Sequence, residues 1–162
     1  MHHKLTKINH TKQRKQHTRK NHKKYSETNT SSILQKFEND ISSYFFEVLL
    51  MVKLFHWKTY SYSTHKATDE LYSKINENMD KFIEVLLGKT GIRINLKNKK
   101  NISLIDPQNK EQFIKHIDSF KSYLINLSTN KAMQLMSNVD LYTIRDELLA
   151  DINQFLYLLS LH

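Results

Sequence analysis

The chain has 162 residues, a net charge of +9, and only two glycines, one proline and no cysteine. So few glycines and prolines exclude a fold built from strands and tight turns, and they predict an all-α protein. The absence of cysteine excludes disulfides and thiolate-bound metals, which leaves histidine, aspartate and glutamate as metal ligands. At this length we expect one domain with an N-terminal tail.

The first 30 residues carry an unbalanced positive charge. Residues 1–24 hold nine of the 25 lysines and arginines and no acidic residue, so the rest of the chain, with 16 basic and 16 acidic residues, is neutral overall. With few apolar residues to bury, the tail is predicted to be disordered over residues 1–30. Its charge favours non-specific binding to nucleic-acid phosphates, and the alternatives are a targeting signal or a solubilising arm. The candidate nucleic-acid-binding residues are Lys12, Arg14, Lys15, Arg19, Lys20, Lys23 and Lys24.

Two amphipathic helices are predicted after the tail, because apolar residues recur at steps of three and four. The first follows a polar hinge and runs over residues 33–57, and the second runs over residues 65–87. Gly88 and Gly91, the only glycines, suit the C-terminal cap of the second helix. The two apolar stripes are Leu34, Phe37, Ile41, Tyr44, Val48, Val52 and Phe55, and then Leu71, Ile75, Met79, Phe82, Ile83 and Leu86.

A polar, basic connection over residues 89–109 separates these helices from two more. The third predicted helix runs over residues 108–127, with a further turn at 131–136, and the fourth begins at Asp140 as its cap. Four helices with one long connection between the second and third predict a ferritin-like four-helix bundle with a crossover, over residues 31–162. The predicted core stripes are Phe113, Ile117, Phe120, Leu124 and Leu127, and then Ile144, Leu148, Ile152, Phe155 and Leu159.

No signal peptide precedes these helices, and no apolar stretch is free of charge over the length that a membrane span requires. The most apolar run, residues 44–57, contains Glu47 and Lys53. We therefore expect an intracellular protein, cytoplasmic or associated with a nucleoid or virion, with no membrane partner.

Four potential metal ligands stand in the segment that joins the first two predicted helices. His56 ends the first helix, His65 opens the second, and Asp80 and Glu84 lie four residues apart on one face of the second. His65 and Asp80 are fifteen residues apart, or about 22 Å along a helix, so one chain cannot bring both to the same metal ion. The histidines can meet each other, but the carboxylates must reach them from another copy of the chain.

The same segment, from Phe55 to Glu84, resembles the Dps proteins, miniature ferritins of DNA-bound starved cells. In that family a His-Trp-Asn sequence ends the first helix, a histidine opens the second, and an aspartate and a glutamate follow on the second helix. His56-Trp57, His65, Asp80 and Glu84 occupy these positions, with Lys58 in place of the usual asparagine, and the histidines here are nine residues apart, fewer than is usual in the family. The chain is also similar to ferritin-like proteins of large DNA viruses.

The resemblance implies that the histidine pair of one subunit and the carboxylate pair of its two-fold mate form one iron-oxidising site. It therefore implies a homo-oligomer that takes iron and uses His56, His65, Asp80 and Glu84 as metal ligands and catalytic residues. The leading hypothesis is a Dps-like ferroxidase that oxidises and sequesters iron and associates with DNA through its basic tail. The alternatives are a nucleic-acid-binding or virion packaging protein without iron chemistry, and a plain helical interaction module.

Overall fold

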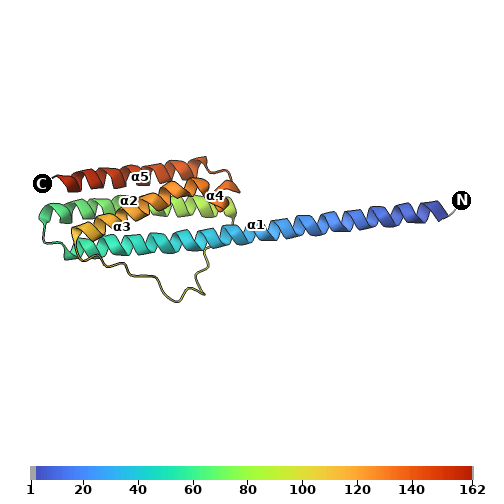
Figure 1. The fold of residues 1–162 in the computed structure, drawn as a ribbon, viewed down its shortest axis with the longest axis horizontal. Coiled ribbons are helices and arrows are strands. Elements are labelled where there is room, and N and C mark those ends of the chain that lie inside the picture. The colour runs from blue at the N-terminus through green and yellow to red at the C-terminus, as the bar shows by residue number, and fades with distance from the viewer. Residues whose placement is uncertain (1–2, 162) are drawn as a thin grey trace. The chain divides into compact units, whose positions relative to one another are not determined.

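The computed structural model describes the backbone of residues 3–161 and the side chains from Asn29 to Leu161. Its regular structure is helical, with no strand between residues 3 and 161, which confirms the predicted all-α class. The chain divides into two compact units, Met1–Leu34 and Gln35–His162. The helices, shown in Figure 1, are α1 (His3–Lys58), α2 (Tyr62–Thr90), α3 (Lys110–Asn126), the 3-10 helix η1 (Leu127–Thr129), α4 (Lys131–Gln134) and α5 (Val139–Ser160).

The prediction of a disordered tail over residues 1–30 is not confirmed, because α1 begins at His3. The segment contains no glycine or proline, and its many lysine, arginine and glutamine residues have favourable helix propensities. Its backbone can therefore be helical without an apolar stripe. The seven candidate nucleic-acid-binding side chains lie outside the described side chains, so their role stays a prediction.

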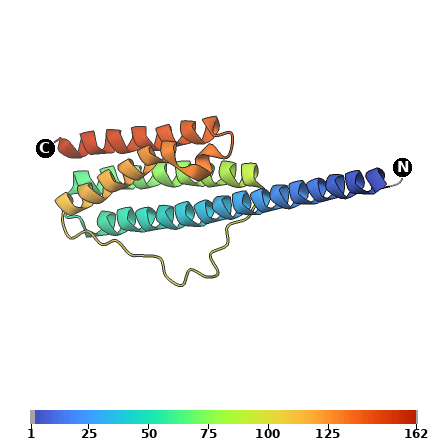
Figure 2. The ribbon, with the colours of Figure 1, turned by 45° about the vertical axis from the view of Figure 1, so that its right-hand side comes forward.

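In the second unit, the long helices lie side by side (Figures 1 and 2). The chain turns sharply after α1, so residues 35–58 of α1 run antiparallel to α2. The connection of residues 91–109 then returns along the length of the helices, so α3 runs in the same direction as α2. After α4 the chain reverses once more, and α5 runs antiparallel to α2 and α3.

Aromatic rings join these helices in one core. The Phe45 ring of α1 contacts Phe82 of α2, with centroids 5.8 Å apart, and Phe120 of α3, at 6.2 Å. Phe113 of α3 stacks on Phe55 of α1 at 4.0 Å and meets Phe155 of α5 edge-on at 6.0 Å. Of the predicted stripe residues with described side chains, all are buried except Leu34, Tyr44 and Ile83, which are half-buried.

The helix ends fix the turn that carries the candidate site. Ser61 caps α2, since its hydroxyl accepts a hydrogen bond from Thr64 N at 3.3 Å, and Gly91 ends α2 with a φ of +67°, a conformation that favours glycine. The prediction that Asp140 caps the last helix is wrong. Asn138 precedes α5, and the Asp140 carboxylate instead pairs with Lys89 at 2.8 Å.

Candidate metal centre

The turn between α1 and α2 brings His56 and His65 into contact. Only three residues separate the end of α1 from the start of α2, so the last turn of one helix faces the first turn of the other. The two imidazole rings stack with their centroids 3.9 Å apart and their planes 24° apart. A spacing of nine residues is therefore sufficient for the two histidine rings to meet, as predicted from the short connection between the helices.

The backbone of each histidine orients the ring of the other. His56 Nδ1 lies 3.1 Å from the carbonyl oxygen of His65, and His65 Nδ1 lies 3.2 Å from the carbonyl oxygen of His56. A carbonyl oxygen only accepts hydrogen bonds, so each Nδ1 carries the hydrogen and donates it. Each Nε2 then keeps its lone pair, which is the tautomer and orientation that a metal-binding histidine needs.

Thr68 supports this arrangement from one turn further along α2. Its buried hydroxyl lies 3.2 Å from His56 Nδ1 and donates to the carbonyl oxygens of Thr64, at 2.8 Å, and His65, at 3.0 Å. His56 is itself buried, at 7% exposure, and His65 is half-buried. The pair is thus held by contacts of both helices.

Asp69 is the nearest carboxylate to the pair. Its Oδ1 lies 3.9 Å from His56 Nε2, the nitrogen that retains its lone pair. Asp69 was not predicted as a ligand. Its position four residues after His65, on the same helical face, was the sequence signal that could have identified it. Within the described residues, no three histidine or acidic side chains converge on one point.

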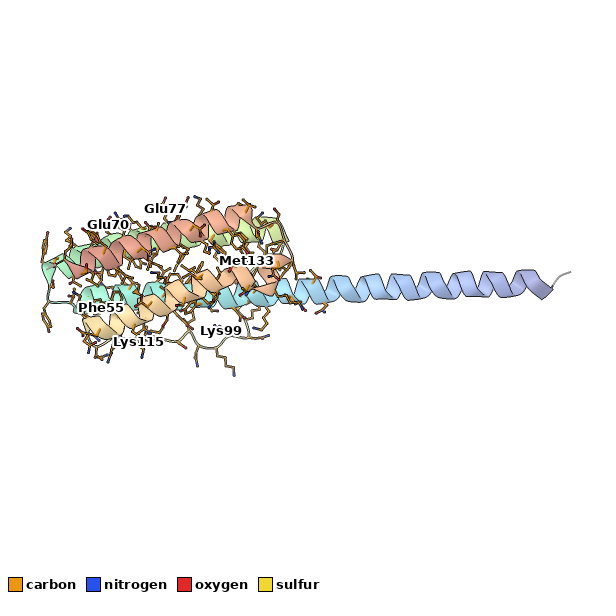
Figure 3. All side chains as sticks on the ribbon, turned by 45° about the horizontal axis from the view of Figure 1, so that its top comes forward. Phe55, Glu70, Glu77, Lys99, Lys115 and Met133 are labelled. Atoms are coloured by element: carbon orange, nitrogen blue, oxygen red, sulfur yellow. The ribbon has the colours of Figure 1, made fainter. Side chains whose placement is uncertain are left out.

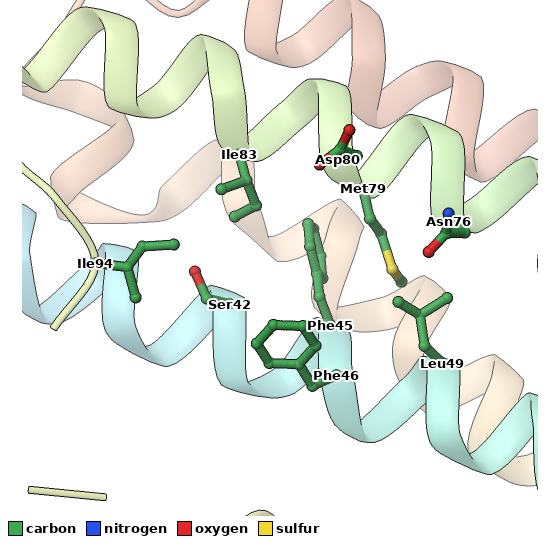
Figure 4. Close-up of a pocket in the computed structure, with 9 residues that line it drawn as sticks. All are labelled: Ser42, Phe45, Phe46, Leu49, Asn76, Met79, Asp80, Ile83 and Ile94. Atoms are coloured by element: carbon green, nitrogen blue, oxygen red, sulfur yellow. The ribbon is translucent and has the colours of Figure 1, made fainter. Parts of the chain in front are cut away.

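Asp80 and Glu84 do not join the histidines within one chain. Both are exposed on α2, which is continuous from Tyr62 to Thr90, so the separation of about 22 Å between His65 and Asp80 holds. Asp80 lies at the edge of a pocket of about 130 Å³ between α1 and α2 (Figure 4). The pocket is lined by Ser42, Phe45, Phe46, Leu49, Asn76, Met79, Asp80, Ile83 and Ile94.

Exposed apolar residues lie on the side of α1 near this pocket. Phe46, Leu50 and Trp57 are 47%, 44% and 67% exposed, and their spacing of four and seven residues puts them on one stripe of α1. Near the middle of this stripe, Lys53 Nζ lies 4.8 Å from the centre of the Tyr72 ring of α2. We call Phe46, Leu50 and Trp57 the apolar stripe of α1.

The acidic cluster on α5 belongs to an ion-paired contact with α2. Lys81 Nζ pairs with Glu147 at 3.1 Å, and Asn78 donates to Asp151 at 2.9 Å. Glu70 and Glu77 lie along the same side of α2 (Figure 3).

Comparison with known proteins gives one family match. A model described as "Family of unknown function (DUF5856)" matches residues 56–159. The matched region begins at His56 and contains His65, Asp80 and Glu84. No curated protein and no solved structure shows significant similarity to the chain. Among the described residues, no helix is both long and apolar enough to cross a membrane.

Proposed function

The chain belongs to the DUF5856 family, and we propose that it is a Dps-like protein that binds and oxidises ferrous iron at sites shared by two subunits. The observation that carries this proposal is the pair His56 and His65, in which each Nδ1 is engaged and each Nε2 keeps a lone pair. Imidazole nitrogens combined with carboxylate oxygens suit iron, with positions left open for an oxidant.

The antiparallel packing of α1 and α2 supports a two-fold arrangement that completes the site. Along the two helices, Phe45 lies beside Phe82 and His56 lies beside His65. On α2, the point midway between His65 and Asp80 lies near Tyr72. A two-fold axis there would bring Asp80 and Glu84 of the partner subunit to the histidine pair.

The apolar stripe of α1 supports the same axis. Lys53 lies against Tyr72, and Leu50 and Trp57 lie about one turn from Lys53 on either side along α1, so the axis would pass beside these two members of the stripe. Burial of such a stripe against a second copy would be favourable. The site and the exposed apolar residues would therefore be completed by the same contact.

The direction of the helices supports a ferritin-like fold. In such a bundle a long crossover makes the second and third helices parallel. Here α2 and α3 run in the same direction, and residues 91–109 return along the helices between them (Figures 1 and 2). We propose a ferritin-like four-helix bundle, assembled into a hollow homo-oligomer that retains the oxidised iron.

In the proposed reaction iron is the substrate. Two ferrous ions each give one electron to hydrogen peroxide, which takes up two protons and leaves as two water molecules; dioxygen is the alternative oxidant. His56 and His65 would bind through Nε2, and Asp69, whose Oδ1 lies 3.9 Å from His56 Nε2, would add a carboxylate from the same chain. Asp80 and Glu84 of the partner subunit would complete the ligands and offset the positive charge of ferric iron.

A mixing experiment tests the shared site. We expect the variants His56→Ala/His65→Ala and Asp80→Ala/Glu84→Ala each to oxidise ferrous iron no faster than buffer after anaerobic loading and addition of peroxide. When the two variants are co-expressed, half of the two-fold pairs are mixed and each mixed pair regains one site, so about one quarter of the wild-type activity should return. Absence of recovery in assembled mixed particles would show that the site is not shared. Wild-type oxidation at the buffer rate would contradict the proposed activity itself.

A second candidate function is the binding of nucleic acid through the N-terminal segment, because residues 1–24 hold nine basic residues and no acidic one. It can accompany the iron chemistry, or replace it in a packaging protein. Replacing Lys12, Arg14, Lys15, Arg19, Lys20, Lys23 and Lys24 by glutamine should weaken duplex DNA binding and reduce its salt dependence. DNA binding that is unchanged in this seven-residue variant would contradict the second candidate.

A further inference from the structure

The connection between α2 and α3 is a second segment with unbalanced positive charge. Residues 85–105 contain five basic residues and no acidic one. Lys89 is neutralised by Asp140 at 2.8 Å. The other four have exposed side chains, and none has an ion-pair partner among the side chains of residues 29–161; they are Arg93, Lys97, Lys99 and Lys100. We call these four residues the basic loop.

Polar side chains of α1 hold the first half of the connection in place. Gln35 Nε2 donates to the carbonyl oxygen of Arg93 at 3.2 Å, and the Asn39 side-chain oxygen accepts from Asn95 N at 3.0 Å. Because these bonds use backbone atoms of the connection, they leave the Arg93 side chain free for another partner.

Two further contacts fix the second half. Glu47 accepts from Ser103 N at 3.3 Å, and Lys58 Nζ pairs with Asp106 at 2.7 Å. The Lys58 ammonium lowers the pKa of the Asp106 carboxyl below its ordinary value, so this pair persists at neutral pH. The four contacts begin at Arg93 and end at Asp106, on both sides of the three lysines, so a ligand would order little additional backbone when it binds.

A turn between these contacts presents the lysines. Lys99 N donates to the carbonyl oxygen of Leu96 at 2.9 Å, and the Asn95 side chain accepts from Lys97 N at 3.2 Å. Lys99 lies on the connection (Figure 3), and the side chains of Lys97, Lys99 and Lys100 are all exposed. The three lysines are thus presented to solvent from a backbone that the fold holds on both sides.

We propose that the basic loop is a nucleic-acid phosphate contact on the folded part of the chain. Residues 89–109 contain no aromatic side chain, so stacking on bases is excluded as the mode of binding. Asn98 and Asn101 alternate with the lysines and can donate hydrogen bonds to phosphate or sugar oxygens. This contact uses no residue of the iron site and no residue of the N-terminal segment, so it does not depend on either part of the proposed function.

The test is the salt dependence of duplex DNA binding, measured by fluorescence anisotropy. Lys97→Gln/Lys99→Gln/Lys100→Gln is compared with the wild-type chain, and the same triple change is made in the seven-residue variant of the N-terminal segment. If each lysine contacts one phosphate, the slope of log K against log salt should fall by about 2.7, or roughly 0.9 for each contact. The decrease should appear in both backgrounds, because the two segments act independently.

The matched control is Lys115→Gln/Lys121→Gln/Lys131→Gln, which removes the same charge from α3 and α4, where these lysines have no ion-pair partner among the described side chains. An equal decrease in the control would show that only net charge matters, and would overturn the proposal. An unchanged slope in the loop variant would also overturn the proposal.

Loss of binding to anionic phospholipid vesicles with DNA binding intact would assign the loop to a membrane surface instead. If the seven-residue N-terminal variant binds DNA like the wild type while the triple loop variant does not, the proposal for the basic loop stands and nucleic-acid binding through the N-terminal segment is contradicted.

Discussion

His56 and His65 each donate a ring hydrogen to the backbone carbonyl of the other, across the turn between α1 and α2. The orientation of each ring is therefore set by the helix that carries its partner, and both Nε2 atoms are directed by backbone contacts rather than by flexible side chains. Such engagement of the distal nitrogen raises metal affinity because the tautomer and the ring orientation are fixed in advance.

Thr68→Val should weaken metal binding without removing a ligand. The change deletes the hydroxyl that lies 3.2 Å from His56 Nδ1, and loss of such a supporting group typically costs about 10-fold or more in metal affinity. The measurement is anaerobic calorimetric titration with ferrous ion. Thr143→Val on α5 is the control, since its hydroxyl also bonds the carbonyl four residues earlier, at 3.0 Å, but far from the site in sequence. Equal affinities for the two variants would exclude a supporting role for Thr68.

Phe46→Asp and Leu50→Asp should each break the proposed two-fold contact. Each would place a charge in the apolar stripe of α1, where a second copy would have to bury it. Light scattering after size exclusion should give a smaller particle, with unchanged helix content by circular dichroism. Ile125→Asp is the control, because Ile125 is 50% exposed on α3, outside the stripe. A native mass that stays at the wild-type value in the stripe variants would argue against this interface.

Phe113→Ala should be strongly destabilising. The ring is fully buried between Phe55 and Phe155, so its removal should lower the free energy of unfolding by about 3–5 kcal/mol. Ile125→Ala, on the same helix and half exposed, should cost much less, about 0.5 kcal/mol. Urea unfolding followed by circular dichroism measures both. A small loss for Phe113→Ala would mean that the rings do not form the core described here.

The stability given by the Lys58–Asp106 pair should depend on pH in the acid range. The pKa of Asp106 is lowered in the folded chain, chiefly by the hydrogen bond from Lys58, so the pair stabilises the fold above the ordinary carboxyl value of 3.8. This contribution is lost as the pH falls below 3.8 and through the lowered value. Urea unfolding of the wild type and Asp106→Asn should thus differ at neutral pH and converge in acid. A difference that is independent of pH would point to a role other than charge.

The helical core could be predicted from the sequence because one physical signal determines it. Apolar residues at steps of three and four face the interior of a bundle, and every predicted stripe residue of α3 and α5 is buried. The meeting of the two histidines also followed from sequence, since a short turn between long helices leaves the adjoining ends nowhere else to lie. Neither conclusion needed distances between helices.

Other features depend on contacts between distant segments. Asp69 was not predicted as a ligand: its place one turn after His65 can be read from the sequence, but its distance to His56 is fixed only when α1 and α2 pack. Asp140 was predicted as a cap, but its carboxylate pairs with Lys89, which lies at the end of another helix. The helix over residues 3–30 was not predicted because a helix made of polar residues has no apolar periodicity.

The ring contacts of α1 have a consequence for how the protein can be divided. A fragment that starts at His56 would keep all four predicted iron ligands, yet it would lose Phe45 and Phe55, which cover Phe82, Phe113 and Phe120. Those three rings would then lose part of their cover, and we expect the remaining helices to be less stable. The segment before the site thus contributes no predicted ligand, but it covers the aromatic core against which the rest of the chain packs.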